Sequence, residues 1–347
     1  MYKEVEEVQN QWKLIKLRND YGMEVHVLNY GGIITRIYVP DREGKLENIV
    51  LGYENIEDYE TDPNFFGALI GRVAGRIHNA TFQLYGEDFE LEKNDGPNNL
   101  HSGLKGFHRQ VWNHETFQTE EEVGVKLSYL SKDGEGGFPG NVNTEVIYTL
   151  NQHNQLTLDY SATTDKETPL TMTNHTYFNL SGKVNHAIHN YQVSLDSRQF
   201  VELNEELIPT GQIIDVESDP LFDFRNERML KEGIQNGGDQ NRIAGEGYDH
   251  YFLFDHKRQV SAEVKDIESG RILSVETNQP GVVLYTSNNL KSGHKLTGGD
   301  SQKYLGLCLE TQGTPASLHH KHLPSIIVNP DEVYKKQTIF TFGITKE

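Results

Sequence analysis

Residues 305–315 read as an apolar strand that ends in a carboxylate: Leu305-Gly-Leu-Cys-Leu-Glu-Thr-Gln-Gly-Thr-Pro315. Side chains alternate across a β-strand, so Leu305, Leu307 and Leu309 are expected to share one face. The other face carries Glu310, and a polar turn is expected to follow it. A carboxylate at the mouth of a buried strand needs either a charged partner or a chemical task. The alternative is an ordinary strand-end carboxylate that faces water.

Alternation of apolar and polar side chains recurs along the chain and is typical of half-buried strands. It is clear in residues 23–27, 156–162, 192–196 and 282–286. Turn sequences rich in Gly, Asn and Asp separate such segments, and 32 glycines suit a sheet protein with many turns. The best helical pattern is short, at residues 226–232. These features predict an all-β fold, a large antiparallel β-sandwich, in which residues 1–347 form a single domain.

The charge balance narrows the classes of partner. Lys and Arg number 32 and Asp and Glu 51, which gives a net charge of −19. Nucleic-acid binders usually carry a basic patch, so no nucleic-acid partner is expected. A neutral ligand such as a sugar needs no charge steering and fits an acidic protein.

The single cysteine and the N-terminus bear on location. Because Cys308 is the single cysteine, no intrachain disulfide can form, which fits a reducing compartment. The simplest interpretation of Cys308 is a thiol packed in the core. The first residues are acidic and lack the apolar core of a signal peptide. No apolar run approaches the ~20 residues of a membrane helix. We therefore expect a cytoplasmic protein with no membrane contact, and the sequence leaves monomer and homodimer open.

Polar clusters interrupt the predicted strands, and two of them lie in the first third of the chain. Residues 71–77, Gly-Arg-Val-Ala-Gly-Arg-Ile, bring Arg72 and Arg76 together in an apolar setting. A packed arginine is a rigid donor for hydroxyls or carboxylates, but a salt-bridged surface pair is the simpler interpretation of this segment alone. His101 lies between an Asn pair and a glycine-rich loop, and loops on rigid scaffolds often carry binding groups. A satisfied structural histidine is the alternative for His101 and for His108.

Two further clusters carry an imidazole and a carboxylate. His175 is flanked by hydroxyls and amides in a strand that also contains Tyr177. An ordinary pKa near ~6.5 lets a histidine donate or accept a proton at neutral pH. Asp249 precedes an aromatic strand and could orient a ligand hydroxyl or a histidine. A buried hydrogen-bonded histidine and a strand-start turn residue remain the alternatives.

Several familiar catalytic motifs do not occur in the sequence. It has no phosphate-binding loop of the G-x-x-x-x-G-K-[ST] type, no G-x-S-x-G elbow and no cysteine-rich metal spacing. Residues 319–322, His-His-Lys-His, could bind a metal adventitiously, but the simpler interpretation is a solvated loop. The sequence motifs thus give no positive indication of a metal or a cofactor.

Taken together, these clusters occur in the order found in a known family. The chain resembles the aldose 1-epimerases, the galactose mutarotase family, over about residues 30–330. The resemblance rests on motifs at residues 71–77, 99–103, 106–107 with Trp112, 133–140, 174–180, 208–211, 222–225, 249–252 and 309–312. Each motif alone is weak, whereas the ordered set is specific. The family fold that the resemblance implies is a single large antiparallel β-sandwich with a sugar cleft on one concave face.

The resemblance also implies roles for individual residues. Glu310 looks like the catalytic base and His175 like the catalytic acid, while Arg76, His101 and Asp249 look like the residues that hold the sugar. Two positions depart from the family pattern. Gly75 stands where many members have Asn, and Ser102 stands where Gly is commoner. Both departures could alter how the sugar hydroxyls are held.

The implied reaction interconverts the α and β anomers of free aldohexoses such as galactose and glucose. Ring opening removes a proton from the C1 hydroxyl and delivers one to the ring oxygen, and without that second proton a costly alkoxide would form. Glu310 would take the first proton and protonated His175 would supply the second, from opposite sides of the bound ring. The partner is thus a monosaccharide. Ring opening involves no redox change and no bond to phosphorus, so the reaction needs neither a cofactor nor a metal.

Other functions remain open on the sequence. One is an epimerase of another reducing sugar, such as maltose or a sugar phosphate, although the net charge makes a phosphate less attractive. A second is a non-catalytic carbohydrate-binding protein on the same fold. A glycoside hydrolase would need two carboxylates flanking one bond, and the best pair, Glu310 with Asp249, lacks a clear acid.

Overall fold

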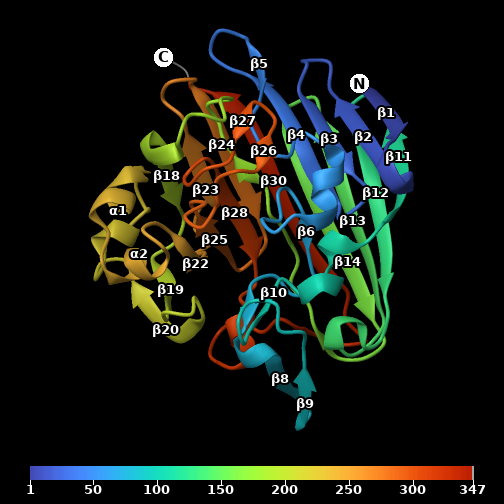
Figure 1. The fold of residues 1–347 in the computed structure, drawn as a ribbon, viewed down its shortest axis with the longest axis vertical. Helices are drawn as coiled ribbons and strands as arrows, with labels where there is room; N and C mark the ends of the chain where they lie inside the picture. Colours follow the sequence, from blue (N-terminus) through green and yellow to red (C-terminus); the bar gives the residue numbers. More distant parts are fainter. Residues whose placement is uncertain (346–347) are drawn as a thin grey trace.

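Two β layers packed face to face make up the protein, as the computed structural model of residues 1–345 shows (Figure 1). The first layer is a nine-stranded sheet in which every neighbouring pair is antiparallel. In spatial order its strands are β11 (Asn113–Gln118), β12 (Glu122–Ser131), β13 (Val142–Asn151), β14 (Gln155–Thr164), β30 (Tyr334–Ile344), β24 (Arg271–Thr277), β23 (Ala262–Lys265), β18 (Gln192–Leu195) and β21 (Arg228–Met229).

The second layer consists of two antiparallel sheets joined by a β-bridge between Val50 and Phe178. The five-stranded sheet contains β1 (Tyr2–Glu7), β2 (Lys13–Arg18), β3 (Glu24–Leu28), β4 (Ile33–Pro40) and β5 (Leu46–Asn48). The six-stranded sheet contains, in spatial order, β17 (Tyr177–Phe178), β28 (Leu307–Gln312), β25 (Gly281–Tyr285), β22 (Asp249–Leu253), β19 (Gln199–Leu203) and β20 (Pro209–Asp215). The predicted all-β antiparallel sandwich is confirmed.

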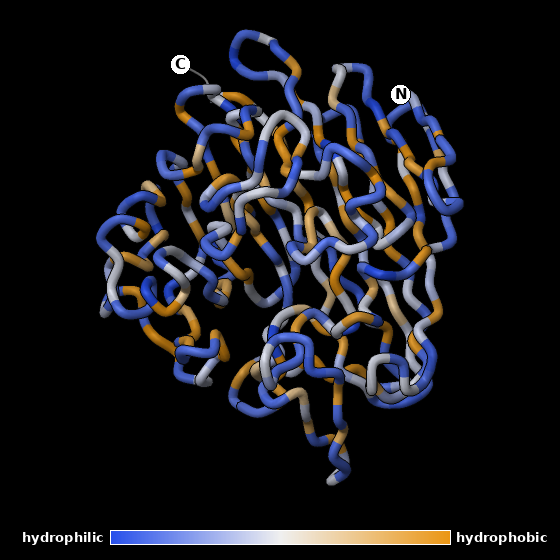
Figure 2. The backbone as a smooth tube through the Cα atoms, viewed as in Figure 1, coloured by the Kyte–Doolittle hydropathy of each residue, from blue (hydrophilic) through white to orange (hydrophobic). Residues whose placement is uncertain are grey.

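The main core lies between the layers because alternate side chains of each strand point inward. In β14 the buried residues Leu156, Leu158 and Tyr160 alternate with half-buried polar ones, and Figure 2 shows this alternation of hydropathy along the strands. The same core cluster takes in β28 through Leu307 and Leu309. The large sheet therefore supports the six-stranded sheet from behind and leaves the outer face of that sheet free for a site.

Short elements complete the fold. Two-stranded ladders pair β6 (Leu69–Ile70) with β16 (Thr173–Asn174), β7 (Arg76–Ile77) with β10 (Asn99–Leu100), β8 (Thr81–Leu84) with β9 (Glu87–Glu90), β15 (Thr168–Pro169) with β29 (Ile327–Val328), and β26 (Lys295–Leu296) with β27 (Gly299–Asp300). Short 3₁₀ helices occupy Gln9–Gln11, Ile56–Thr61, His78–Ala80, Gly103–Lys105, Phe107–Arg109, Glu135–Gly137, Ile188–Asn190, Pro220–Phe222 and Pro315–Leu318. The β8–β9 hairpin projects from the bottom of the molecule in Figure 1.

The α-helices of residues 1–345 are α1 (Lys231–Asn236) and α2 (Asp239–Ile243). The helix predicted at residues 226–232 is therefore wrong for most of its length. Arg228 and Met229 instead pair with β18 as strand β21, because the edge of the large sheet offers them a hydrogen-bonded partner. Within residues 1–345 no helix is both long and apolar enough to cross a membrane.

Strand β28 does not end at Glu310. The strand runs two residues further, to Gln312, and all six of its residues are buried. It lies between β17 and β25, where Glu310 is directly opposite Val283. The expected mouth of the strand is thus its interior, and Glu310 is paired with β25, whereas β17 pairs only with Leu307 and Cys308. The assignment of residues 1–347 to one domain stays a prediction, and residues 346–347 lie outside the described part of the chain.

Candidate active site

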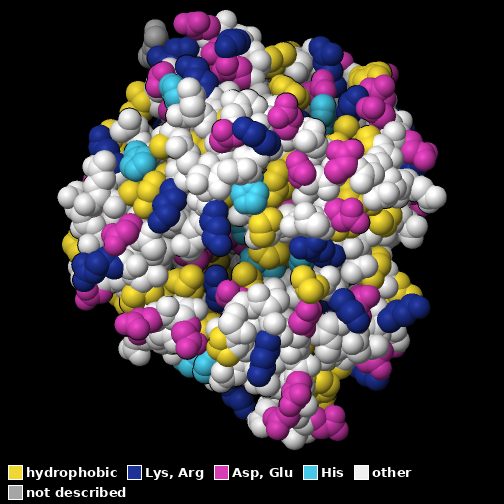
Figure 3. Space-filling view, in the orientation of Figure 1, with side chains coloured by type: hydrophobic (Ala, Val, Ile, Leu, Met, Phe, Trp, Pro, Cys, Tyr) yellow, Lys and Arg dark blue, Asp and Glu magenta, His cyan; other side chains and the backbone are white. Residues whose placement is uncertain are grey.

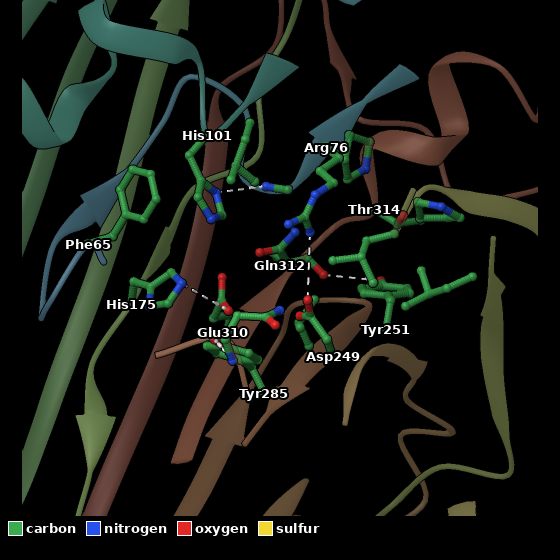
Figure 4. A pocket seen from close by; sticks show the side chains of 18 of the residues that line it. Phe65, Arg76, His101, His175, Asp249, Tyr251, Tyr285, Glu310, Gln312 and Thr314 are labelled. Carbon is green, nitrogen blue, oxygen red and sulfur yellow. Dashed lines mark hydrogen bonds and ion pairs between the residues drawn. The ribbon is translucent and has the colours of Figure 1, made fainter. Parts of the chain in front are cut away.

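Five residues singled out in the sequence line one cavity of about 220 Å³: Arg76, His101, His175, Asp249 and Glu310 (Figure 4). The cavity opens on the outer face of the six-stranded sheet. In the face drawn in Figure 3, acidic and basic side chains are interspersed, with no large area of a single sign. The structure therefore brings together residues from five separate segments of the chain.

Neighbouring strands set the spacing of the two carboxylates. Asp249 begins β22 and is opposite Tyr285 of β25, while Glu310 of β28 is opposite Val283 on the other edge of β25. One strand thus separates the two carboxylates, and alternation directs both away from the core. His175 follows β16 at the side of this sheet, where its backbone N–H donates to the carbonyl of Ala68 at 2.8 Å.

His175 and Glu310 are in direct proximity. Nε2 of His175 lies 3.4 Å from Oε1 of Glu310, and the two residues are 5% and 4% exposed. Burial lowers the pKa of His175 to about 4 and raises that of Glu310 well above its ordinary value. Asp249 raises the Glu310 pKa further, and Arg76 opposes the rise. A gap of 3.4 Å cannot hold a pyranose, so the expected placement on opposite sides of a ring is replaced by two neighbouring groups.

His101 is fixed as a hydrogen-bond donor toward the cavity. Its Nδ1 accepts a hydrogen bond from the backbone N–H of Gly75 at 3.0 Å. Burial holds the pKa of His101 well below its usual range, so the ring is neutral. A neutral imidazole that accepts at Nδ1 must carry its proton on Nε2. No pattern in the sequence indicated this tautomer, because it depends on a backbone contact between segments that flank the β7–β10 ladder.

The same contact bears on metal binding. Ligand atoms of His101, His175 and Glu310 lie within 4.8 Å of one another, as in two-histidine, one-carboxylate metal sites. A metal ion at Nε2 of His101 would require the proton on Nδ1, where the Gly75 N–H already points. Metal-binding histidines normally face an acceptor with their other nitrogen. This donor set therefore does not fit a metal ion as it stands.

Arg76 lies between two carboxylates. Its Nε donates to Oδ2 of Asp95 at 2.7 Å, and its Nη1 lies 3.7 Å from Oδ2 of Asp249. Burial raises the pKa of Asp249 to about 6, although Arg76 opposes the rise. Arg76 is thus both an ion-paired residue and a cavity residue, so the two sequence interpretations coexist. Asp95 was missed, and no pattern in the sequence pointed to it.

Gln312 is a cavity residue that the sequence could have indicated. Its amide nitrogen donates to the carbonyls of Ala74 and Gly313 at 3.2 and 3.3 Å, which fixes the orientation of the amide. The buried oxygen Oε1 has no protein partner. Alternation places residue 312 on the same face as Glu310, so the signal was present. An unpaired buried acceptor is costly and uncommon, and a bound ligand hydroxyl is one way to satisfy it.

Aromatic side chains wall the cavity, and their role was not foreseen. The ring of Phe65 packs against His101 and His175, with centroids 4.7 and 5.8 Å apart. Phe65 has a left-handed backbone, with φ of 58°, and Asp62 holds this turn by accepting from the N–H groups of Asn64 and Phe66. The other aromatic residues that line the cavity are Tyr177, Tyr251 and Tyr285.

Some residues considered in the sequence lie elsewhere. Arg72 is buried and donates to Ser131 and to the carbonyl of Pro139, so it fastens a loop. His108 is buried against Phe65 and does not line the cavity. Cys308 is a buried thiol, as expected, and its Sγ lies 3.7 Å from Nδ1 of His175. Residues 319–322 form no metal-sized cluster with other described residues.

The two departures from the family pattern have local explanations. Gly75 has φ of +92°, and a Cβ there would approach Pro315 to 3.0 Å. Ser102 has a left-handed φ of 66°, and its hydroxyl donates to the carbonyl of Val73 and accepts from the Val73 N–H. The Ser102 side chain therefore fastens the His101 loop and does not line the cavity, while Gly75 lines it through its backbone.

Comparisons with known proteins identify the relatives of this chain. The family model described as aldose 1-epimerase matches residues 13–341. Galactose mutarotase from Bos taurus is 37% identical over 93% of this chain and 92% of its own length. Aldose 1-epimerase from Escherichia coli K12 is 32% identical over 95% of each chain.

Solved structures agree as well. Galactose 1-epimerase from Lactobacillus acidophilus superposes with a TM-score of 0.88 at 28% identity and covers 99% of both chains. An aldose epimerase homologue from C. elegans has the same TM-score at 29% identity and covers 96% of this chain and 99% of its own. The ordered motifs, the sandwich and these similarities lead to one conclusion: the chain belongs to the aldose 1-epimerase family.

Proposed function

We propose that this protein is an isomerase, an aldose 1-epimerase that interconverts the α and β anomers of free aldohexoses by acid–base ring opening and closure. The observation that carries the proposal is the placement of Glu310 beside His175, at 3.4 Å, in the wall of a cavity lined by further polar groups. Relatives named galactose mutarotase and aldose 1-epimerase point to the same reaction.

Glu310 is the proposed base and His175 the proposed acid. Glu310 removes the proton of the C1 hydroxyl while protonated His175 delivers a proton to the ring oxygen. Both oxygens are bonded to C1, so two neighbouring side chains can reach them from one side of the sugar. The open aldehyde then turns about its C1–C2 bond, and ring closure runs the two transfers in reverse. No net proton is gained or lost over a full cycle.

The other polar groups supply complementary hydrogen bonds to the hydroxyls. Arg76 and the Nε2–H of His101 are donors, whereas ionised Asp249 and the unpaired Oε1 of Gln312 are acceptors. A hydroxyl has a single hydrogen and can donate to one acceptor at a time. Glu310, Asp249 and Gln312 therefore need three different hydroxyls. A polyhydroxylated sugar with a free C1 hydroxyl fits this requirement.

Galactose and glucose are the proposed substrates, and the proposed location is the cytoplasm, which the single cysteine supports. A monomer and a homodimer are both compatible with the proposed function. Maltose or a sugar phosphate stays an alternative substrate. A carbohydrate-binding protein without activity is less favoured, because binding alone does not require a neighbouring acid and base.

Polarimetry tests the proposal. Freshly dissolved α-glucose and α-galactose lose their excess rotation slowly on their own, and the purified protein is expected to accelerate both decays in proportion to its concentration. Maltose and glucose 6-phosphate run in parallel reveal the alternative substrates. If the protein binds these sugars in calorimetry but every decay keeps its spontaneous rate, the protein is a binder and not an epimerase.

A further inference from the structure

We propose that Asp95 is a positioning residue for Arg76, which it holds by the Nε atom so that the outer guanidinium nitrogens stay available to a sugar hydroxyl. The inference rests on the proposed function, because it assigns Arg76 to the bound sugar. Asp95 lies outside the cavity lining, so it acts on the substrate only through Arg76.

Arg76 and Asp95 are in direct contact. Nε of Arg76 donates to Oδ2 of Asp95 at 2.7 Å, a charge-assisted hydrogen bond of normal length. Nη1 of Arg76 is 3.7 Å from Oδ2 of Asp249, too far for a hydrogen bond. Arg76 thus makes its close contact with the outer carboxylate and leaves the inner one unbonded.

Without Asp95, Arg76 would be free to form an ion pair with Asp249. A guanidinium next to a buried carboxylate favours a two-bonded ion pair, because both groups lose water on burial. Such a pair with Asp249 would occupy the hydrogen-bonding atoms of both residues. Asp95 prevents this arrangement because it holds Nε of Arg76. The outer nitrogens of Arg76 can then donate to the sugar, and Asp249 can accept from it.

The backbone holds Arg76 and Asp95 in a fixed relative position. Arg76 in β7 pairs with Leu100 in β10, a few residues after Asp95. A tight turn joins Asp95 to β10. In this turn the backbone N–H of each of Asp95 and Asn98 donates to the carbonyl of the other. The side chain of Asn98 accepts from the N–H of Asn79, just beyond β7. These contacts therefore keep Asp95 at a fixed distance from β7, the strand that carries Arg76.

The charged and titratable groups that face Arg76 also bear on pH. Asp249 and Asp95 both raise the pKa of Arg76 against the lowering by burial, and Asp95 raises that of Asp249. The remaining neighbours are Tyr285, Glu310, His101 and His175 around the cavity and His78, His319 and His320 in the adjoining groove. Removing the Asp95 charge should therefore let Asp249 ionise at lower pH.

The test compares Asp95→Ala with Asp95→Asn by polarimetry. Asp95→Ala loses both charge and acceptor, and its KM for aldose should rise about tenfold with kcat within about threefold. Asp95→Asn keeps an oxygen that can accept from Nε, and its KM should stay within about threefold of the natural protein. The acid limb of kcat/KM should move to lower pH in both variants. Asp88→Ala, which removes an exposed carboxylate from the β8–β9 hairpin, should change neither.

Three outcomes would overturn the inference. They are an unchanged KM in Asp95→Ala, an equal rise of KM in Asp95→Ala and Asp95→Asn, and a fall confined to kcat. Asp95 is partly exposed, at 38% for its side chain, so the variants are expected to fold, and thermal unfolding checks this. If the natural protein itself fails to accelerate mutarotation, the proposed function fails. Calorimetric sugar affinities of the same variants then still decide the role of Asp95.

Discussion

Glu310 and His175 form a buried pair, with Oε1 and Nε2 3.4 Å apart. Burial raises the pKa of Glu310 and lowers that of His175, so a single proton shared by the pair lies mainly on the carboxyl group of Glu310. Under the proposed mechanism the reactive arrangement is the other one, with Glu310 ionised and His175 protonated. Because the two sites are coupled, the limbs of a pH profile belong to the pair and not to either residue alone.

The pH dependence of kcat/KM is expected to be bell-shaped. Asp249, with a pKa of about 6, must ionise before it accepts a hydroxyl, so activity rises with pH through that value. Activity falls again at higher pH, where the Glu310–His175 pair loses its shared proton. Polarimetry across a pH series checks this profile. A flat profile, with ring opening shown to be rate-limiting, would contradict the assignment.

Glu310→Gln is expected to lower kcat by at least about 100-fold, because an amide cannot take the C1 proton. Sugar affinity should persist, since the amide oxygen can still accept a hydrogen bond. Rates come from polarimetry and affinities from calorimetry. The matched control is Glu120→Gln, an exposed residue in the turn between β11 and β12, which should leave both quantities unchanged. Near-normal rates in Glu310→Gln would place the base elsewhere.

Asp249→Asn is expected to make the protein more stable at neutral pH. The folded protein raises the pKa of Asp249 from 3.8 to about 6, so ionising this carboxyl destabilises the fold by about 2–3 kcal/mol. Below about pH 4 the carboxyl is protonated in both folded and unfolded states, and the advantage of the variant vanishes. It grows as the pH rises from 4 to 6 and stays constant above. Denaturant unfolding at pH 4 and pH 7.5 measures the two free energies.

The outcome that contradicts this prediction is an equal or lower free energy of unfolding for the variant at pH 7.5. Buried histidines such as His175 and His250 also make stability depend on pH. Their pKa values are lower in the folded protein, so the unfolded chain binds protons more readily and the folded protein loses stability as the pH falls below about 6.5. These residues are present in both proteins, so their effects cancel in the difference.

Gln312→Met is expected to raise KM for aldoses about 10-fold or more, because it removes the acceptor for one hydroxyl while keeping the side-chain length. A deoxy sugar that lacks this hydroxyl should bind the natural protein more weakly, by a similar factor, yet lose little further in Gln312→Met. Thr311→Val is the matched control, since Thr311 is the preceding residue of β28 and bonds to Thr338 on the core side. Equal losses for every deoxy sugar in both proteins would exclude a role for Gln312.

The fold was largely predictable because strand alternation is a local signal. Val193 and Leu195 alternate with polar neighbours, and this period survives whatever pairs with the strand. Helix α1 was misplaced because a competing partner, the open edge at β18, drew Arg228 and Met229 into a ladder. The end of β28 was misjudged for the same kind of reason, since β25 continues to pair with it as far as Gln312.

The site was predictable where chemistry shows in the residue type and hidden where it depends on contacts. A carboxylate after an apolar run marked Glu310, and ordered motifs marked His175 through the family resemblance. Asp95 gave no signal, because an exposed turn aspartate is common and only the 2.7 Å contact with Arg76 distinguishes it. The left-handed backbone of Phe65 was equally hidden, since most residues of this type adopt other conformations.

Strand β30, the last one described, enters the nine-stranded sheet between β14 and β24. Before this strand is synthesised, the large sheet exists only as two pieces with unpaired inner edges. Such unpaired edges can form hydrogen bonds with strands of other chains and so promote aggregation. Productive folding must therefore wait until translation has delivered residues 334–344, and a truncated product that stops earlier should depend on chaperones and precipitate readily.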